Sequence, residues 1–429
     1  MPSDVFIALD PGGEFFQPFL FNYNGNLYQL IPSQASYPTP GPIQMWKSTN
    51  SGATWTVLSS TVLSQRPEGV AACLLGTKLY LFYPNSSTSS ASGELAYFDF
   101  TTDSFTLVTT TGTVPQPDNS ILAGPDPNHL YVINFTVIGG AHLIIGELVS
   151  NAYSSIGSLP EVLGADGMCA NSMLLGASGI LHILYTTSPF AVQTSPSSLA
   201  YCNVQSGVLV GTTSSTVVIS SFSDGFPFGY PGLYSQPIQI GSNILLAYYD
   251  PTAQAVKLLS FDDVGTPTFT TSVIDASFSV ATGIPTGAFT IVLGLVGSTG
   301  SDGGGAAAAI RPGAAPRLTS ATALYCFYTN FSGAYEPLPN NGDGWLYYKT
   351  STDGGATWSP RKQAVQHIDP TDLTPLPILI PEIGQPVGST TLGKIPISYR
   401  TNTANAEGQY LYGRFYFGLS FAGSKNYVF

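Results

Sequence analysis

Short strand-like runs recur along the chain at a nearly constant spacing. Each run is six residues long, rich in Leu, β-branched and aromatic residues, and too short for a helix. The first three spacings between aligned residues are 52, 51 and 51. Such a period indicates a repeat architecture built from one supersecondary unit. The aligned residues are Leu27, Leu79, Leu130, Leu181, Leu245, Leu324 and Ile395.

Each run stands in a unit that holds further short strands. KLYLFY (residues 78–83), for example, is preceded by GVAACLL and followed, after a loop rich in Ser, by ELAYFDF. Units of about 50 residues with about four antiparallel strands fit a β-propeller blade better than a solenoid coil. We therefore predict an all-β chain that forms a single β-propeller domain over residues 1–429, with seven blades, or six as the alternative.

The two ends of the chain predict how the ring closes. The last unit offers only about three strands, near Glu382, in KIPISY and in QYLYGRFYFG, whereas the chain begins with an isolated strand, DVFIALD. We expect this N-terminal strand to complete the last blade, which leaves no exposed sheet edge. Pro396 fits poorly inside KIPISY, because proline cannot donate a hydrogen bond to a strand ladder.

Residues 278–310 exceed what a regular blade needs. The segment contains GSTGSDGGG followed by alanines, a composition typical of flexible linkers. We interpret residues 278–310 as an insertion with a flexible Gly/Ala-rich loop.

Two related strings, KSTNSGATW and KTSTDGGATW, lie in the first and sixth units. In both, an Asn or Asp side chain can bond the backbone of a tight turn, Gly permits a positive φ, and Trp can pack beneath the hairpin. The strings resemble the Asp box, or BNR repeat, of sialidases and related propellers. The resemblance covers these two boxes and the blade period, and it implies a structural role on the face opposite the active site. The box residues are Ser48, Asn50, Gly52, Thr54 and Trp55, and Ser351, Asp353, Gly355, Thr357 and Trp358.

The charge of the chain limits the classes of partner that it can bind. Only 9% of residues are charged, the net charge is −12, and the 13 basic residues are scattered. Phosphate binding needs clustered Lys and Arg, so we expect no nucleic-acid partner. There is no run of 18 apolar residues and no signal-peptide pattern, so we expect no transmembrane segment. We expect a secreted or cell-surface protein, with any leader already removed or with export by another route.

Metal and cofactor motifs are missing from the sequence. Four cysteines show no Cys-x-x-Cys spacing, and the four histidines have no metal-ligand spacing, so we expect buried thiols and satisfied histidines. We predict no cofactor and no metal site, with a structural cation in the central channel left open as an alternative.

Charged residues stand where a propeller presents its functional face. The loops that lead into each innermost strand, and those that join the second strand to the third, share one face around the channel. Our catalytic candidates there are Arg66, Glu68, Asp118 and Arg311. The carboxylates either bond free backbone N–H groups and channel water, or form a ring that binds a sugar or a cation.

A site like that of the sialidases requires three arginines around the substrate carboxylate, a Tyr/Glu nucleophile pair and an acidic Asp. Bidentate arginines suit a carboxylate, and a carboxylate-assisted Tyr suits an anomeric carbon. This chain has six arginines and no Phe/Tyr-Arg-Ile-Pro motif. The sequence leaves one such set of three arginines open, in which Arg66 and Arg311 are joined by Arg400.

Two loops supply candidate sugar-binding residues. SDGFPFGYPGLY (residues 223–234) concentrates aromatic rings among Gly and Pro, and TNFSGAYEPLPNNGDG (residues 329–344) adds further polar and aromatic groups. Flat rings suit the CH face of pyranoses, although the first loop could instead fold over the channel as a plug. The ligand-binding candidates are Asp166, Asp224, Phe226, Phe228, Tyr230, Tyr335, Glu336 and Glu382.

Three functions remain open from the sequence. The first is a carbohydrate-recognising propeller whose partner is a glycan or polysaccharide. The second is an exo-acting glycosidase that resembles sialidases and uses a carboxylate as acid or base. The third is a structural or adhesive surface protein, because scarce charge favours self-association.

Overall fold

The computed structural model describes the backbone of the strands and of the turns between many of them. The described residues are 5–10, 19–36, 39–59, 71–84, 93–112, 118–136, 142–160, 172–187, 197–210, 216–222, 237–250, 253, 255–276, 291–296, 317–318, 323–329, 345–368, 375–376, 379–383, 385–386, 394–395, 397–404, 410–417 and 421–422. None of them forms a helix long and apolar enough to cross a membrane.

The first half of the described chain forms sheets in which four strands follow one another in chain order. Sheet B holds β2 (Phe19–Tyr23), β3 (Asn26–Ser36), β4 (Thr39–Ser48) and β5 (Thr56–Ser59), and β30 (Gln385–Pro386) from late in the chain pairs in parallel with β2. Sheet C holds β6 (Ala71–Leu75), β7 (Lys78–Pro84), β8 (Gly93–Asp99) and β9 (Ser104–Val108). Sheet D holds β10 (Asp118–Asp126), β11 (His129–Thr136), β12 (His142–Val149) and β13 (Ala152–Pro160).

The next sheets repeat this plan with additional short strands. Sheet E holds β14 (Ser172–Leu175), β15 (Leu181–Thr187), β16 (Ser197–Gln205), β17 (Val208–Val210) and β18 (Thr216–Phe222). Sheet F holds β19 (Ile238–Ile240), β20 (Asn243–Asp250), β21 (Ala255–Asp262), β22 (Thr270–Asp275) and β24 (Arg317–Leu318). Sheet G holds β23 (Ile291–Val296), β25 (Ala323–Thr329), β26 (Trp345–Ser351), β27 (Lys362–Ile368) and β28 (Pro375–Leu376).

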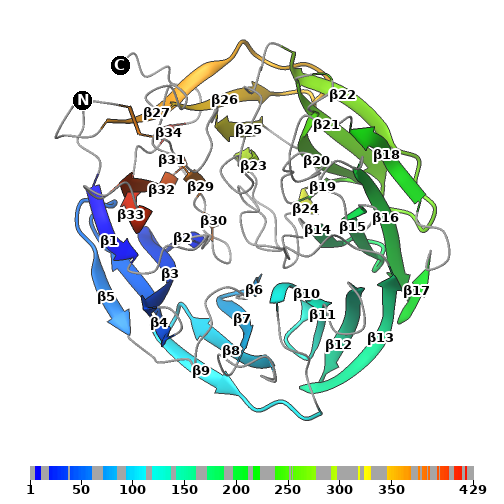
Figure 1. Ribbon diagram of the computed structural model, residues 1–429, viewed down its shortest axis with the longest axis horizontal. Coiled ribbons are helices and arrows are strands. Elements are labelled where there is room, and N and C mark those ends of the chain that lie inside the picture. The colour runs from blue at the N-terminus through cyan, green and yellow to red at the C-terminus, as the bar shows by residue number, and fades with distance from the viewer. Residues whose placement is uncertain are drawn as a thin grey trace.

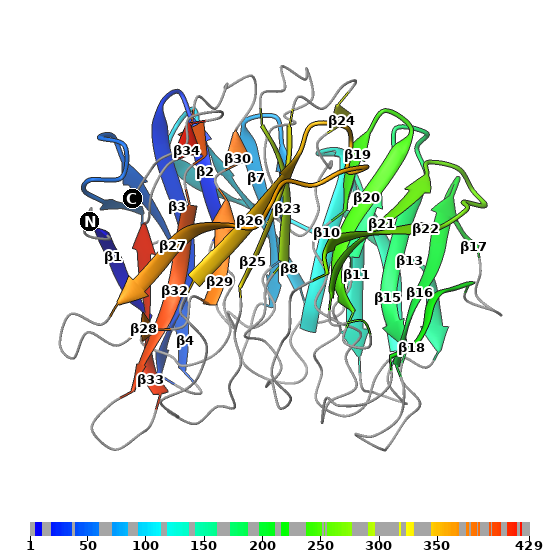
Figure 2. The same cartoon turned by 90° about the horizontal axis from the view of Figure 1, so that it is seen from above.

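The sheets stand around a common centre, as Figure 1 shows. In sheets B to G the four consecutive strands run outward from the centre in chain order. Consecutive strands pair antiparallel within each sheet, and Figure 2 shows them running between the two faces of the ring. This arrangement confirms the predicted all-β β-propeller.

Apolar side chains fill the spaces between neighbouring sheets. Because side chains alternate along a strand, each sheet presents one apolar row to the sheet before it and another to the sheet after it. Phe21 and Tyr28 of sheet B, for example, share a buried cluster with Leu79, Leu81 and other residues of sheet C. Burial at the sheet interfaces therefore holds the ring together.

The ends of the chain meet in sheet A. Its strand order is β1 (Val5–Asp10), β33 (Tyr410–Phe417), β32 (Ile397–Ala404) and β29 (Leu379–Ile383), and β1 pairs antiparallel with β33. The predicted closure by the N-terminal strand is therefore confirmed. Pro396 falls between β31 (Lys394–Ile395), which pairs with β34 (Phe421–Ala422), and β32. Pro396 itself lies outside the described residues, so the expectation for it stays a prediction.

Part of the interpreted insertion belongs to a sheet. β23, within residues 278–310, pairs along its whole length with β25 and is the innermost strand of sheet G. The other residues of 278–310 lie outside the described residues, and for them the insertion stays a prediction.

Candidate functional site

The two faces of the ring differ in the length of their connections. On one face, tight turns join strands: Asn24 and Gly25 join β2 to β3, and Gly76 and Thr77 join β6 to β7. On the opposite face, residues 85–92 join β7 to β8 and residues 330–344 join β25 to β26. We call these the short-turn face and the long-connection face. Long connections of this kind supply the chain from which ligand sites are built, and one further long connection, from β23 (Ile291–Val296) to β25, leaves its strand at the short-turn end.

The two predicted Asp boxes, residues 48–55 and 351–358, lie on the short-turn face, between the third and fourth strands of sheets B and G. In sheet G, Gly355 N donates to Ser351 Oγ over 2.8 Å, and Ser351 Oγ donates to Asp353 Oδ1 over 2.7 Å. Thr357 donates to both carboxylate oxygens of Asp353, from N over 2.9 Å and from Oγ1 over 2.5 Å. Trp358 Nε1 closes the turn on the carbonyl of Gly355 at 3.1 Å.

The box of sheet B reproduces this geometry with Asn in place of Asp. Gly52 N donates to Ser48 Oγ at 2.9 Å, and Thr54 N donates to Asn50 Oδ1 at 2.9 Å. Trp55 Nε1 donates to the carbonyl of Gly52 at 3.1 Å. The polar groups of both boxes are thus engaged inside their own turns.

The box carboxylate is an acceptor held in its charged form. Hydrogen bonds from Thr357 and then from Ser351 lower the pKa of Asp353 to about 2, although the side chain is fully exposed. Gly355 has φ +95, and a Cβ there would lie 2.5 Å from Leu258 Cδ2 of sheet F. The box therefore packs against the neighbouring sheet, which accounts for its residues without a ligand.

Most predicted ligand residues lie outside the described residues. Their places in the chain follow from the strands on either side: residues 223–236, for instance, join β18 to β19 on the long-connection face. Asp118 is the first residue of β10, at the long-connection end of an innermost strand. The undescribed candidates are Arg66, Glu68, Asp166, Asp224, Phe226, Phe228, Tyr230, Arg311, Tyr335 and Glu336.

Two candidates stand at other places relative to the strands than we expected. Arg311 falls between β23 and β25, so its connection leaves the innermost strand at the short-turn end instead of leading into it. The expectation assumed that the innermost strand lies just before ALYCFY, but that strand is β23. Glu382 is the fourth residue of β29, which begins at Leu379, and it pairs with Ser398. Leu379 pairs with Arg400, the third arginine of the arrangement left open above.

Every Lys and Arg side chain that the structure describes contacts an acid, a carbonyl or an aromatic ring of the protein. Arg361 Nε donates to Asp275 Oδ2 over 2.7 Å, and its guanidinium stands over the Tyr347 ring. One of the six arginines is thus committed to a contact between sheets. The described lysines are engaged as follows: Lys47 with Asp103, Lys78 with the Tyr97 ring, Lys257 with Asp250, Lys349 with the carbonyl of Ile274, and Lys362 with the Tyr348 ring.

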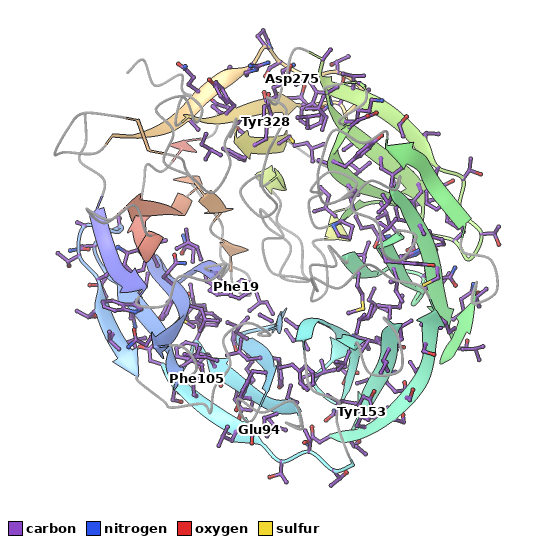
Figure 3. The ribbon with its side chains drawn as sticks, in the orientation of Figure 1. Phe19, Glu94, Phe105, Tyr153, Asp275 and Tyr328 are labelled. Atoms are coloured by element: carbon purple, nitrogen blue, oxygen red, sulfur yellow. The ribbon has the colours of Figure 1, made fainter. Side chains whose placement is uncertain are left out.

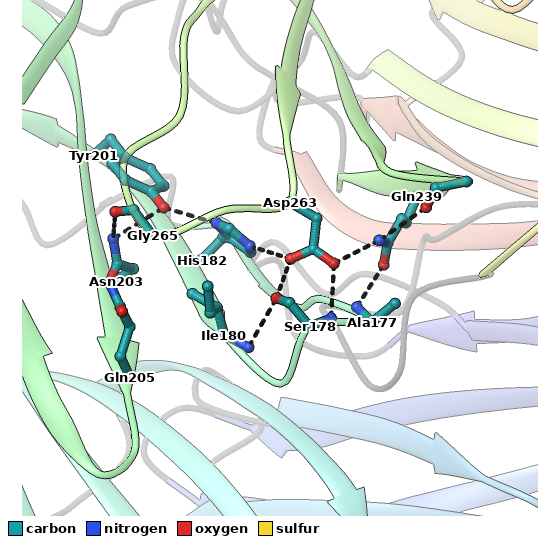
Figure 4. Close-up of polar contacts among 11 residues, drawn as sticks. Ala177, Ser178, Ile180, His182, Tyr201, Asn203, Gln205, Gln239, Asp263 and Gly265 are labelled. Atoms are coloured by element: carbon teal, nitrogen blue, oxygen red, sulfur yellow. Dashed lines mark hydrogen bonds and ion pairs between the residues drawn. The ribbon is translucent and has the colours of Figure 1, made fainter.

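A buried polar network joins sheets E and F at the short-turn face (Figure 4). His182 on β15 is 1% exposed, with Nδ1 at 2.7 Å from Tyr201 Oη and Nε2 at 2.9 Å from Asp263 Oδ1. Gln239 Nε2 and Ser178 N donate to Asp263 Oδ2 over 2.8 and 2.9 Å. The turn of sheet E is thus tied to the strands of sheet F. A Cβ on Gly176 would lie 2.1 Å from Asp263 Oδ1, so only glycine fits there.

The protonation states in this network follow from its partners. Burial alone would raise the pKa of Asp263, but the hydrogen bonds from Ser178 and His182 outweigh it and lower the pKa. Asp263 is therefore an acceptor, so His182 donates from Nε2 and accepts at Nδ1 from the Tyr201 hydroxyl. Burial lowers the pKa of His182 more than Asp263 raises it, so the imidazole is neutral.

The network lacks the order of a nucleophilic triad. Ser178 Oγ donates to Asp263 Oδ1 over 2.5 Å, whereas His182 bonds Asp263 and Tyr201. A catalytic serine needs the histidine as its own partner, to take its proton. We therefore assign the network to the structure of the ring. The interpretation of His182 as a satisfied histidine is confirmed.

A second buried cluster joins sheets F and G (Figure 3). Asp275, 2% exposed at the end of β22, accepts from Arg361 and from Tyr328 Oη, the latter over 2.5 Å. Burial, followed by the hydrogen bond to Asp275, raises the pKa of Tyr328. Sequence reasoning missed both acids, because Asp263 directly follows β21 and Asp275 is the last residue of β22, and acids are ordinary at such strand ends. The signal in the sequence is the scarcity of charge, which makes each acid at a strand end unusual.

Among the described residues, no group of three or more His, Cys, Asp or Glu side chains could hold a metal ion. Cys73, Cys202 and Cys326 are buried free thiols, as expected, while Cys169 lies outside the described residues.

Comparisons with known proteins show the fold. No protein-family profile and no curated protein sequence matches the chain. An ulvan lyase of polysaccharide lyase family PL25 matches with a TM-score of 0.54 at 8% identity, over 99% of this chain and 97% of that one. A fungal alcohol oxidase of the AA5 family, in complex with copper, matches with a TM-score of 0.52 at 10% identity, over 97% and 75%. A six-bladed lectin from Aleuria aurantia reaches 0.41 at 11% identity, over 100% of both chains.

Proposed function

We propose that this protein is a carbohydrate-recognising Asp-box β-propeller that binds glycans on its long-connection face. The observation that carries the proposal is the asymmetry of the ring. On the short-turn face, the described turns of sheets B, E and G have polar groups that bond one another, whereas the candidate sugar-binding segments leave the strands on the opposite face. Function in propellers is placed by such loops on a rigid scaffold.

The chemistry of the long connections supports a sugar as the ligand. Residues 223–236 join β18 to β19 and contain Phe226, Phe228 and Tyr230 beside Asp224. Rings stack on the apolar face of a pyranose while carboxylates and amides accept from its hydroxyls. The ulvan lyase has been solved bound to -[GlcA(1-4)Rha3S]-, a polysaccharide unit, on the same kind of fold.

A glycan array with the purified chain tests the proposal. We expect binding to a subset of glycans, and a loss of at least ten-fold in affinity when Phe228 and Tyr230 are both replaced by Ala, since the two rings together then have to supply only about 1.4 kcal/mol of contact with the sugar. Leu107→Ala is the matched control, because Leu107 is 63% exposed on the outermost strand β9. Binding that both variants retain equally would reject the aromatic loop as the site.

An exo-acting glycosidase is the second candidate, favoured by Asp118 at the long-connection end of β10. An acid or base there would contribute about 10² to 10⁴ in rate. Turnover of fluorogenic glycosides that falls in Asp118→Asn or in Glu68→Gln would support it, and unchanged turnover in both variants would reject those assignments. A chain silent in both assays would instead support the structural or adhesive function.

We infer that each four-stranded antiparallel sheet corresponds to one blade, which gives seven blades instead of six. The sheets A to G each contain a four-stranded antiparallel path, and this supports the larger number. An experimental map of the ring viewed along its axis would count the blades directly, and six would refute the inference.

We also infer that the protein acts outside the cell or at its surface. A surface made mostly of uncharged polar residues, with 9% charged residues in the chain, supports this location. Fractionation of the producing cells tests it, and recovery from the cytosol alone would refute it.

A further inference from the structure

One interface between sheets differs from the rest in chemistry. Gln29 lies on β3, the second strand of sheet B, and is 0% exposed. Its neighbours along the strand, Tyr28 and Leu30, belong to the apolar cluster shared with sheet C. Because side chains alternate along a strand, Gln29 points to the other face of sheet B, toward sheet A. Figure 1 places sheet A there, and β29 lies against β2.

In the other described sheets, the corresponding place on the second strand is apolar. Each of these residues faces the preceding sheet and is 0% exposed, so the fold itself does not require a polar group at this position. The residues are Leu81, Val132, Ile183, Leu246 and Cys326.

The amide of Gln29 finds no partner among the described residues. Neither its Oε1 nor its Nε2 has a hydrogen bond within the described part of the ring. Across the strands its paired residues are Leu20 on β2 and Trp46 on β4. The indole Nε1 of Trp46 donates to Gln44 Oε1 at 3.2 Å, so it is used elsewhere. A buried carboxamide without partners costs several kcal/mol, so an occupant must complete these bonds.

A second unpaired amide oxygen lies on the same face. Asn22 on β2 pairs with Leu27, two residues before Gln29, and its buried Oδ1 also lacks a partner among the described residues. Diagonal neighbours on paired strands have Cα atoms about 7 to 8 Å apart, a separation that a water molecule spans between two amide side chains. A water accepts from Gln29 Nε2 and donates to Asn22 Oδ1, and a second water donates to Gln29 Oε1.

We propose that the interface where the ring closes, between sheets A and B, holds an internal water site organised by Gln29 and Asn22. The described interfaces between the later sheets bury continuous apolar clusters at the equivalent place. The closing interface is thus hydrated at a place where the next sheets bury apolar side chains. This inference does not depend on the proposed sugar function.

A crystal structure of the full chain, at a resolution that shows ordered water, tests the site. We expect a water oxygen within hydrogen-bond distance of a Gln29 amide atom and a water on Asn22 Oδ1. A side chain of sheet A bonded directly to the Gln29 amide, or an amide with no partner at all, would overturn the proposal.

A pair of substitutions provides an independent readout. Gln29→Leu restores the residue type found at the equivalent positions and releases the water, so we expect an unchanged or higher melting temperature. Leu81→Gln is the matched control, because it places the same amide in the dry interface between sheets B and C and should lower the melting temperature. A Gln29→Leu variant that melts as low as Leu81→Gln, or fails to fold, would overturn the proposal, because a direct partner in sheet A would then be left unpaired.

Discussion

At the scale of single residues, buried polar groups decide how neighbouring sheets are joined. His182, Asp263 and Asp275 are almost fully buried at sheet interfaces, and each is held by side chains of the adjoining sheet. A buried charge is stable only when it is paired and hydrogen-bonded. The sequence predicts the apolar rows of these interfaces from their alternation, but it does not reveal which acids are buried, because that depends on contacts between distant residues.

The neutral state of His182 predicts a pH dependence of stability. Its pKa is lowered by burial, and that of Asp263 is also lowered, so the unfolded chain binds more protons than the folded chain in acid. Stability is therefore fully present above the unfolded pKa of histidine, about 6.5, and falls as the pH drops below it. Thermal melts from about pH 8 to about pH 5 should show this loss.

His182→Gln is the comparison for these melts, because glutamine keeps a donor toward Asp263 and does not titrate. We expect a flatter profile in this variant between about pH 7 and about pH 5. Parallel profiles of the two proteins would contradict the role of His182.

The glycine pair of the second Asp box allows a matched test of close packing. Gly354 and Gly355 both have positive φ, but a Cβ on Gly354 meets nothing within 4 Å whereas one on Gly355 meets Leu258 at 2.5 Å. Both substitutions to Ala strain the backbone by about 1 kcal/mol, and Gly355→Ala adds overpacking of about 1 to 3 kcal/mol. Chemical denaturation should rank Gly355→Ala as the less stable variant, and equal stabilities would contradict the packing of the box on sheet F.

At the scale of elements, strand existence was predictable and some strand roles were not. The repeated runs lie in second strands, because each is paired in its sheet with a strand nearer the centre, such as β14 or β19. Arg311 was misplaced because the connection from β23 to β25 is long, and the sequence does not indicate which apolar run before ALYCFY is its partner. Register is set by pairing across the sheet, which a single run does not encode.

The ion pair between sheets F and G predicts a stability cost for one arginine. Arg361→Ala leaves the carboxylate of Asp275 buried with Tyr328 and a more distant Lys349, 3.9 Å away. We expect a loss of about 3 kcal/mol. Lys362→Ala removes a cation at the start of β27, beside the Tyr348 ring of β26, and should cost under about 1 kcal/mol. Urea denaturation of both variants measures the difference, and equal costs would contradict the assignment of Asp275 as a paired buried charge.

The closing strand predicts the effect of trimming the N-terminus. Removal of residues 1–10 deletes β1 and exposes the unpaired edge of β33. Exposed edges associate, so we expect a lower melting temperature and concentration-dependent aggregation. Addition of a peptide of residues 1–12 should restore part of the melting temperature by the same pairing. A trimmed chain that melts like the full chain would contradict closure through β1.

At the scale of the whole molecule, the repeat period led to the correct architecture before any contact was known. The period, the short strands and the isolated N-terminal strand are consequences of the ring, because each blade repeats one antiparallel unit and the ends must meet. The candidate site was harder to predict from the sequence. Its candidates lie in connections with no periodicity, so residue type was the only guide to them.

The structure of the complex with the best glycan from the array tests the central claim most directly. We expect the sugar on the long-connection face, in contact with residues 223–236 and near the first residue of β10. A sugar bound on the short-turn face, beside the Asp boxes, or on the outermost strands would contradict the account.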